Sequence, residues 1–147
     1  MRILSLTLTA TLLLLPEAYA LTPEEKGLEI AVEVDRRDTG WGDSRTNMTM
    51  TLYNKQGESS IRSMKSSSLE GKDDGDKTII VFDEPKDVKG PALLTFTHKQ
   101  GADDQWLYLP ALKRVKRIAS RNKSGPFVGS EYAYEDLTSQ EVEKYTY

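Results

Sequence analysis

The sequence predicts a mainly β fold, a curved antiparallel sheet with one helix packed on it. From Thr46 onward, apolar and polar residues alternate with a period of two in short segments that turn residues separate at regular intervals. A helical pattern occurs once, near the start of the chain. Strands and helices do not alternate as they do in parallel α/β folds, so an antiparallel sheet is the expected arrangement.

The first twenty residues have the features of a cleavable secretory signal peptide. Arg2 gives a positive start, residues 3–15 are apolar apart from Ser and Thr, and residues 18–20 form the small-x-small motif Ala-Tyr-Ala. A membrane anchor is the alternative, but the apolar stretch is shorter than the roughly 20 residues that a spanning helix needs. We therefore expect cleavage after Ala20 and a protein exported to the periplasm.

The mature chain, residues 21–147, has a length that suits one domain. Its composition, 29% charged and 37% hydrophobic over the whole chain, is typical of a globular protein. The absence of cysteine excludes a disulfide framework, a cysteine-based metal site and lipid attachment to cysteine. Residues 142–147 have the pattern of a strand that ends without a turn or cap. We therefore expect residues 21–147 to be the N-terminal portion of a longer domain.

A helix is predicted to begin at the sequence Thr-Pro-Glu-Glu. Thr22 is the expected N-cap, Pro23 suits the first helical position, and Glu25 is placed to complete a capping box. Gly40 and Gly42 end the pattern. Apolar residues at helical spacing form a stripe that we expect to cover another apolar surface. This stripe consists of Leu28, Ile30, Ala31, Val32 and Val34.

Five later segments predict strands, residues 46–53, 59–67, 78–82, 92–98 and 105–109. The turn residues 54–57, Asn-Lys-Gln-Gly, predict that the first two strands pair as a hairpin. The run Thr-Ile-Ile-Val-Phe in the third strand predicts burial on both faces. In the fourth strand, Leu94 and Phe96 share one face, opposite Leu93. In the first strand, Met48, Met50 and Leu52 share a face that suits either a plain core or an adaptable apolar cavity.

Residue patterns of an enzyme are absent, so we predict no enzymatic activity, no cofactor and no metal site. The chain has one histidine, His98, at a strand end, and its serines lie mostly in a loop-like run. A nucleophile with a positioned base is therefore poorly supported. The aspartates at residues 73–76 and 103–104 suit solvated turns, and residues 73–84 lack the ligand spacing of a calcium loop. A hydrolase stays a distant alternative that rests on His98 and these acidic turns.

Charge is unevenly distributed along the chain. The net charge is −3, so bulk nucleic-acid binding is not indicated, yet residues 113–123 are strongly basic. Alternation in residues 113–118 places charge on both faces of a strand, which is typical of a sheet edge. Three explanations stay open: a solvated strand face, a docking patch for an acidic partner, or contact with anionic lipid headgroups. The residues expected to contact a partner are Lys113, Arg114, Lys116 and Arg117.

Four blocks of the mature chain carry a family resemblance, residues 33–38, 42–44, 104–118 and 124–137. The third block is the most specific: Trp-Leu-Tyr-Leu-Pro-Ala-Leu leads into the basic segment, and a Gly-containing loop then leads to an acidic Tyr-Glu-Asp strand. In these blocks the chain resembles the LolA-like outer-membrane lipoprotein-sorting proteins. Members of that family are longer, which agrees with the expectation that further strands follow Tyr147.

The resemblance implies part of a half-open β-barrel, a curved antiparallel sheet whose concave apolar face has a helical lid. Such a fold implies a non-enzymatic periplasmic carrier for lipid or lipid-modified cargo, with lipoprotein acyl chains as ligands and an inner-membrane transporter or outer-membrane acceptor as partner. The alternative is an adaptor or sensor module for an envelope protein or a resistance-nodulation-division transporter. The expected cavity residues are Met48, Met50, Leu52, Ile80, Phe82, Leu94, Phe96, Trp106 and Tyr108.

Overall fold

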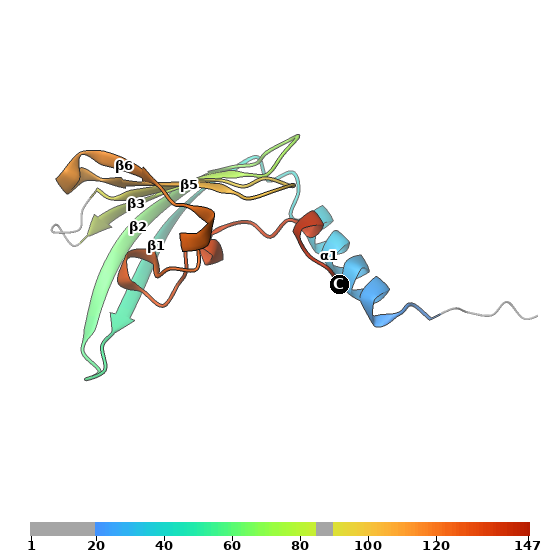
Figure 1. Ribbon diagram of the computed structural model, residues 1–147, viewed down its shortest axis with the longest axis horizontal. Helices are drawn as coiled ribbons and strands as arrows, with labels where there is room; N and C mark the ends of the chain where they lie inside the picture. The colour runs from blue at the N-terminus through green and yellow to red at the C-terminus, as the bar shows by residue number, and fades with distance from the viewer. Residues whose placement is uncertain (1–19, 85–89) are drawn as a thin grey trace, which may run out of the picture.

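Six antiparallel strands form one curved sheet in the part of the chain that the computed structural model describes, residues 20–84 and 90–147 (Figure 1). Each strand pairs with the next one along the chain. The predicted mainly β fold with an antiparallel sheet is therefore confirmed. The predicted signal peptide, up to residue 19, and most of the connector after the third strand lie outside the described residues. The strands are β1 (Asp43–Tyr53), β2 (Ser59–Leu69), β3 (Lys77–Glu84), β4 (Ala92–Phe96), β5 (Asp104–Leu109) and β6 (Arg114–Arg117).

The helix α1 (Pro23–Arg37) begins at the predicted residue with the predicted capping box. The Thr22 backbone N–H donates to the Glu25 carboxylate at 2.8 Å, and the Glu25 N–H donates to the Thr22 hydroxyl at 3.2 Å. These two bonds satisfy two of the N–H groups that a helix start leaves without partners.

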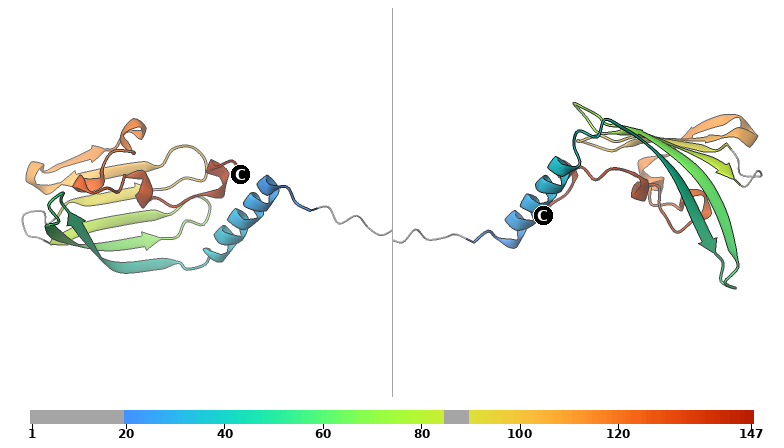
Figure 2. Two further views of the ribbon diagram at one scale, coloured as in Figure 1. Left: turned by 90° about the horizontal axis from the view of Figure 1, so that it is seen from below. Right: turned by 180° about the vertical axis from the view of Figure 1, so that it is seen from behind.

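The prediction that α1 packs on the sheet is wrong. The helix extends beyond one end of the sheet (Figures 1 and 2), has no buried residue, and packs against the 3₁₀ turn η6 (Val142–Lys144). The reason lies in the linker to β1, where the Glu70 carboxylate accepts the backbone N–H groups of Gly40 at 2.5 Å and Gly42 at 2.7 Å. Both glycines have positive φ, so the chain leaves the helix in a direction that other residues disfavour.

Most of the segment after β6 lies under the concave face of the sheet, and its last turn lies beside α1 (Figure 2). It consists of irregular chain and four short 3₁₀ turns, η3 (Ser120–Asn122), η4 (Phe127–Gly129), η5 (Glu135–Leu137) and η6. The strands predicted at the Tyr-Glu-Asp sequence and at residues 142–147 are therefore wrong. Local hydrogen bonds such as Lys144 N–H to the Glu141 carbonyl satisfy the backbone there instead of a ladder. We call residues 118–147 the C-terminal segment.

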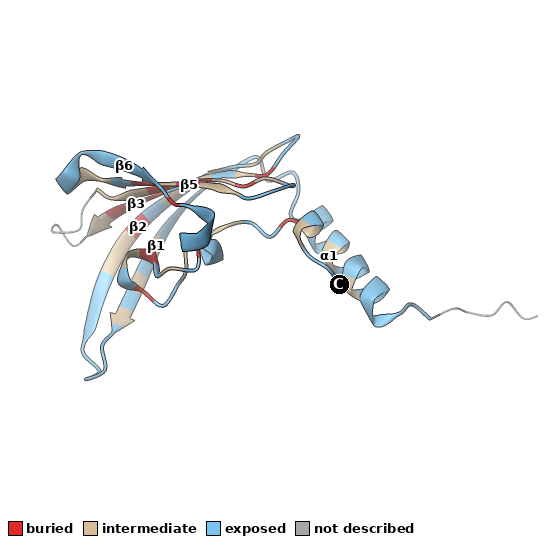
Figure 3. Ribbon diagram, viewed as in Figure 1, coloured by how far each residue is buried: buried red, intermediate tan, exposed pale blue. Residues whose placement is uncertain are grey.

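The hydrophobic core lies between the concave face and the C-terminal segment (Figure 3). Phe127 inserts from the segment, and its ring lies 5.6 Å from that of Phe82 and 5.6 Å from that of Tyr134. The predicted burial of β3 on both faces is wrong. Ile80 and Phe82 are buried, but Ile79 on the other face is 39% exposed, because the C-terminal segment covers one face of the sheet. The buried apolar cluster is Met64, Ile80, Phe82, Leu93 and Phe127.

Candidate functional site

The nine residues predicted to line a cavity lie on two opposite faces of the sheet. The strand register aligns Met48 with Met64 and Met64 with Phe82, which places these side chains on the concave face. Leu94 is aligned with Trp106 on the convex face. The concave members of the predicted set are Met48, Met50, Leu52, Ile80 and Phe82. The convex members are Leu94, Phe96, Trp106 and Tyr108.

A hollow of 640 Å³ opens on the concave side, between the end of the β1–β2 hairpin and residues 129–132 of the C-terminal segment. Met50 and Leu52 are half-buried and supply its apolar lining from β1. Ile80 and Phe82 do not line it, since they belong to the buried core. The hollow therefore combines apolar contacts at one wall with a polar rim. The polar rim residues include Asn54, Glu58, Arg62, Ser130 and Glu131.

Arg62, at the rim of this concave hollow, binds the C-terminal segment. Its guanidinium donates a hydrogen bond to the backbone carbonyl of Val128. Val128 has a positive φ of 48°, which is strained for a β-branched residue, so the segment is held here in an unfavourable backbone conformation. Sequence reasoning missed Arg62 because nothing in the local pattern of β2 indicates a contact 66 residues later in the chain.

A second hollow, of 510 Å³, lies on the convex face of β3 to β6. The rings of Phe96 and Trp106 meet edge to face at 5.3 Å, and the Lys77 ammonium group lies 5.1 Å from the centre of the Phe96 ring. The lining is almost wholly apolar. Ile79 also lines this hollow, although it is not among the predicted cavity residues. It follows directly before Ile80 in β3, so its side chain lies on the opposite face of the sheet, and this alternation is the sequence signal that could have identified it. The lining residues are Ile79, Ala92, Leu94, Phe96, Trp106, Tyr108 and Val115.

The four predicted partner-binding residues lie on or next to β6, which forms one edge of the six-stranded sheet. The expectation of an edge is therefore confirmed. Lys113 follows a 3₁₀ turn at residues 110–112 with a left-handed φ of 47°. Arg117 forms an ion pair with Asp104 of β5. Arg114 and Lys116 are exposed and lie on the same edge strand, so their charges face solvent.

His98 lies in a surface ion-pair network that joins two turns to β5. Its Nδ1 lies 2.6 Å from the Asp74 carboxylate and its Nε2 lies 3.4 Å from that of Asp104. The bond to Asp74 is the main reason that the pKa of His98 is raised, and the same bond holds the pKa of Asp74 well below its usual range. The two carboxylates that His98 contacts connect the turn at Asp74 and strand β5 to the end of β4.

Within residues 20–84 and 90–147, no group of His, Cys, Asp and Glu side chains is placed to hold a metal ion. In the same residues, no helix combines the length and the apolar character that crossing a membrane requires.

The chain is similar to known proteins in sequence and in fold. Residues 74–147 match the model of a protein family whose description is "-like: Uncharacterized protein". No curated protein matches the chain.

Two solved structures match over most of the chain. A domain from Vibrio parahaemolyticus that is named for outer-membrane lipoprotein sorting is 65% identical, with a TM-score of 0.81, and the match covers 84% of this chain and 52% of that one. A DUF1329 family protein from Desulfovibrio piger is 34% identical, with a TM-score of 0.77, and the match covers 86% of this chain and 54% of that one. The chain therefore spans about half the length of both solved proteins.

Proposed function

Because this chain belongs to the LolA-like family of lipoprotein-sorting proteins, we propose that it is a non-enzymatic periplasmic carrier of lipid or lipid-modified cargo. The observation that supports the proposal most is the concave hollow between the β1–β2 hairpin and the C-terminal segment. Its volume of 640 Å³ falls within the range of about 300–1,000 Å³ that is usual for small-ligand sites.

The chemistry of the concave hollow suits an acyl chain with a polar end. Burial of each methylene group of an acyl chain contributes about 0.8 kcal/mol. Met50 and Leu52 offer an apolar wall, and Met50 also packs against the buried core, so an inserted chain would lie against continuous apolar surface. Methionine is unbranched and polarizable, which allows it to adapt to chains of different shape. Arg62 and the rim carboxylate of Glu131 remain near the opening for polar groups of the cargo.

Uptake of a fluorescent fatty-acid probe tests the proposal. Met50→Asp places a charge on the apolar wall and is expected to weaken probe binding at least tenfold, because a carboxylate must lose its water when the chain enters. Thr49→Asp is the matched control, since Thr49 is exposed on the opposite face of the same strand and does not line the hollow. Equal binding by the wild-type protein and Met50→Asp would remove the concave hollow as the cargo site.

Export is tested separately by expressing the full chain in a Gram-negative host. We expect the protein in the periplasmic fraction, with Leu21 as its first residue in intact-mass spectrometry, because Ala20 ends the small-x-small motif. Retention of residues 1–20 in a membrane fraction would contradict the periplasmic carrier.

A further inference from the structure

His98 lies between two carboxylates that come from different parts of the chain. It belongs to the β4–β5 loop, residues 97–103, and its partners are Asp74 of the β2–β3 turn, residues 70–76, and Asp104 of β5. Nδ1 lies 2.6 Å from the first carboxylate and Nε2 lies 3.4 Å from the second. An ionised carboxylate only accepts hydrogen bonds, so both contacts are hydrogen bonds only when both ring nitrogens carry a proton. The arrangement is therefore that of the imidazolium form.

The tip of the β2–β3 turn is attached to the β4–β5 loop through Asp74. At the base of the turn, the Asp76 carbonyl accepts the Thr97 N–H at 2.9 Å, and this bond involves no titratable group. The tip, residues 72–74, is exposed. There the Asp74 carboxylate accepts the backbone N–H of Lys99 at 2.9 Å and contacts the imidazole ring. The ring therefore contributes directly to the position of the tip.

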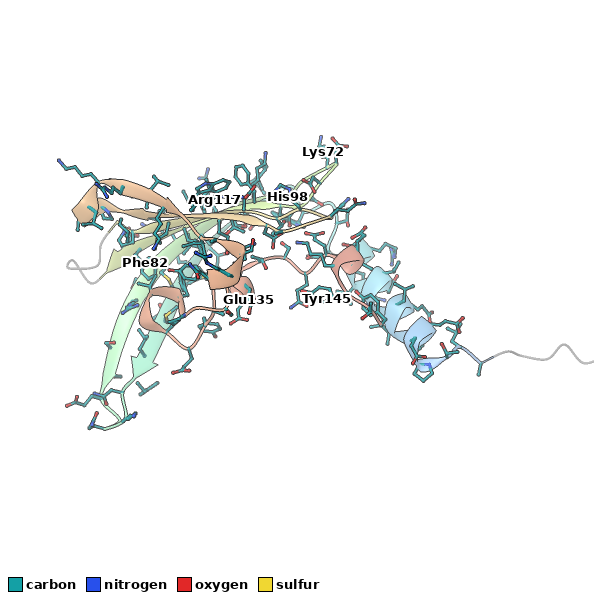
Figure 4. The ribbon with its side chains drawn as sticks, viewed as in Figure 1. Lys72, Phe82, His98, Arg117, Glu135 and Tyr145 are labelled. Carbon is teal, nitrogen blue, oxygen red and sulfur yellow. The ribbon has the colours of Figure 1, made fainter. Side chains whose placement is uncertain are left out.

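His98 is the one ion-pair partner of Asp74 in the part of the chain that the structure describes. Asp104 differs, because Arg117 also binds it. Figure 4 shows His98 between Arg117 and the turn that carries Lys72. The charged side chains on the elements around His98 are Glu70, Lys72, Asp73, Asp74, Asp76 and Lys77 next to or within the turn, Lys99, Asp103 and Asp104, Arg117 of β6, and Lys123, Glu141 and Lys144 of the C-terminal segment.

We propose that His98 is a pH-dependent latch, which holds the tip of the β2–β3 turn on the β4–β5 loop when both ring nitrogens are protonated and releases it when the ring loses a proton. A neutral ring has one N–H, so one carboxylate then faces a lone pair. In either tautomer Asp74 loses its ion pair. Because the bond to Asp74 raises the pKa of His98, the release is expected above the ordinary histidine value of about 6.5.

The latch lies beside the contacts that hold the end of the C-terminal segment. The Ser139 hydroxyl donates to the Asp76 carboxylate of the turn at 3.4 Å, and the Lys144 ammonium group donates to the Asp103 carboxylate of the loop. A change in pH would therefore act on the two structures to which this segment is attached. The proposal goes beyond the carrier function and does not depend on cargo in the concave hollow.

Spin-label distances measured on the full chain test the latch. The chain has no cysteine, so Lys72→Cys in the tip and Gln100→Cys in the loop, both at exposed positions, provide the two label sites. We expect close label pairs at about pH 5. The ratio of close to separated pairs should fall about fivefold by about pH 9, which is the upper range for one exposed ion pair. His98→Gln should show the high-pH ratio throughout, and Asp74→Asn, which leaves the ring in place, should do the same.

Glu141 is the competing source of pH dependence, because burial raises its pKa and its carboxylate accepts a hydrogen bond from Thr97 in the same loop. Glu141→Gln is therefore the matched control and should keep the pH dependence of the wild-type side chains. Circular dichroism should show unchanged folding for His98→Gln, since the His98 side chain is at the surface. A constant ratio between about pH 5 and about pH 9, a pH dependence that persists in His98→Gln, or one that is lost in Glu141→Gln would overturn the proposal.

Discussion

Replacement of Phe127 by alanine tests whether the C-terminal segment is an integral part of the core. The Phe127 side chain is 1% exposed and meets the rings of Phe82 and Tyr134, each at 5.6 Å. Phenylalanine-to-alanine changes at buried positions cost about 3–5 kcal/mol, and the aromatic contacts favour the upper part of this range. Since small domains have free energies of unfolding of about 5–15 kcal/mol, Phe127→Ala should remove about a quarter or more of the stability.

Urea unfolding followed by circular dichroism measures this loss. Tyr132→Ala is the matched control, because Tyr132 lies in the same segment, is 56% exposed, and should change the free energy of unfolding by less than about 0.5 kcal/mol. A loss below about 1 kcal/mol for Phe127→Ala would refute the reasoning. It would mean that the C-terminal segment is not packed on the concave face and that the wall of the concave hollow is absent in solution.

Three further changes test other parts of the fold. Thr22→Ala should destabilise α1 by about 1 kcal/mol through loss of the N-cap, seen as faster amide exchange in the helix. Asp74→Asn should lower the pKa of His98 in an NMR titration. Because the folded-state pKa of His98 is raised, its contribution to stability is complete below the unfolded-state pKa and is lost as pH rises through the folded-state pKa. Gly75→Ala should cost about 1–3 kcal/mol in thermal unfolding, since a Cβ there would lie 2.6 Å from the Thr97 carbonyl group.

The sheet was predictable because its signals are local. In the β1–β2 turn, the Asn54 side chain accepts the N–H groups of Gln56 at 3.0 Å and Glu58 at 2.9 Å, and Gly57 has a φ of +83°. Each of these features depends on a few neighbouring residues. The helix start at Thr22 has the same property, which is why its capping bonds could be predicted individually.

The C-terminal segment was not predictable from alternation, because alternation indicates a strand only where a neighbouring strand offers a ladder. The turn η6 and Tyr147 lie against α1, and the Tyr147 hydroxyl donates to the Val142 carbonyl at 3.2 Å. The helix placement failed for a related reason. The apolar stripe of α1 predicts a covered face, yet Val34 is 62% exposed, and the direction of the helix is set by distant Glu70.

The predicted cavity residues were divided between two faces because alternation within one strand does not reveal the register between strands. Leu93 and Leu94 show the consequence: Leu93 is aligned with Ile80 and is buried, whereas the next residue is aligned with Trp106 on the opposite face. A sheet that is apolar on both faces normally has both faces covered. Among the described residues the C-terminal segment covers the concave face, so Leu94 and Trp106 are half-buried although they are as apolar as the buried Leu93, and alternation within one strand cannot tell which of its two apolar faces will be covered.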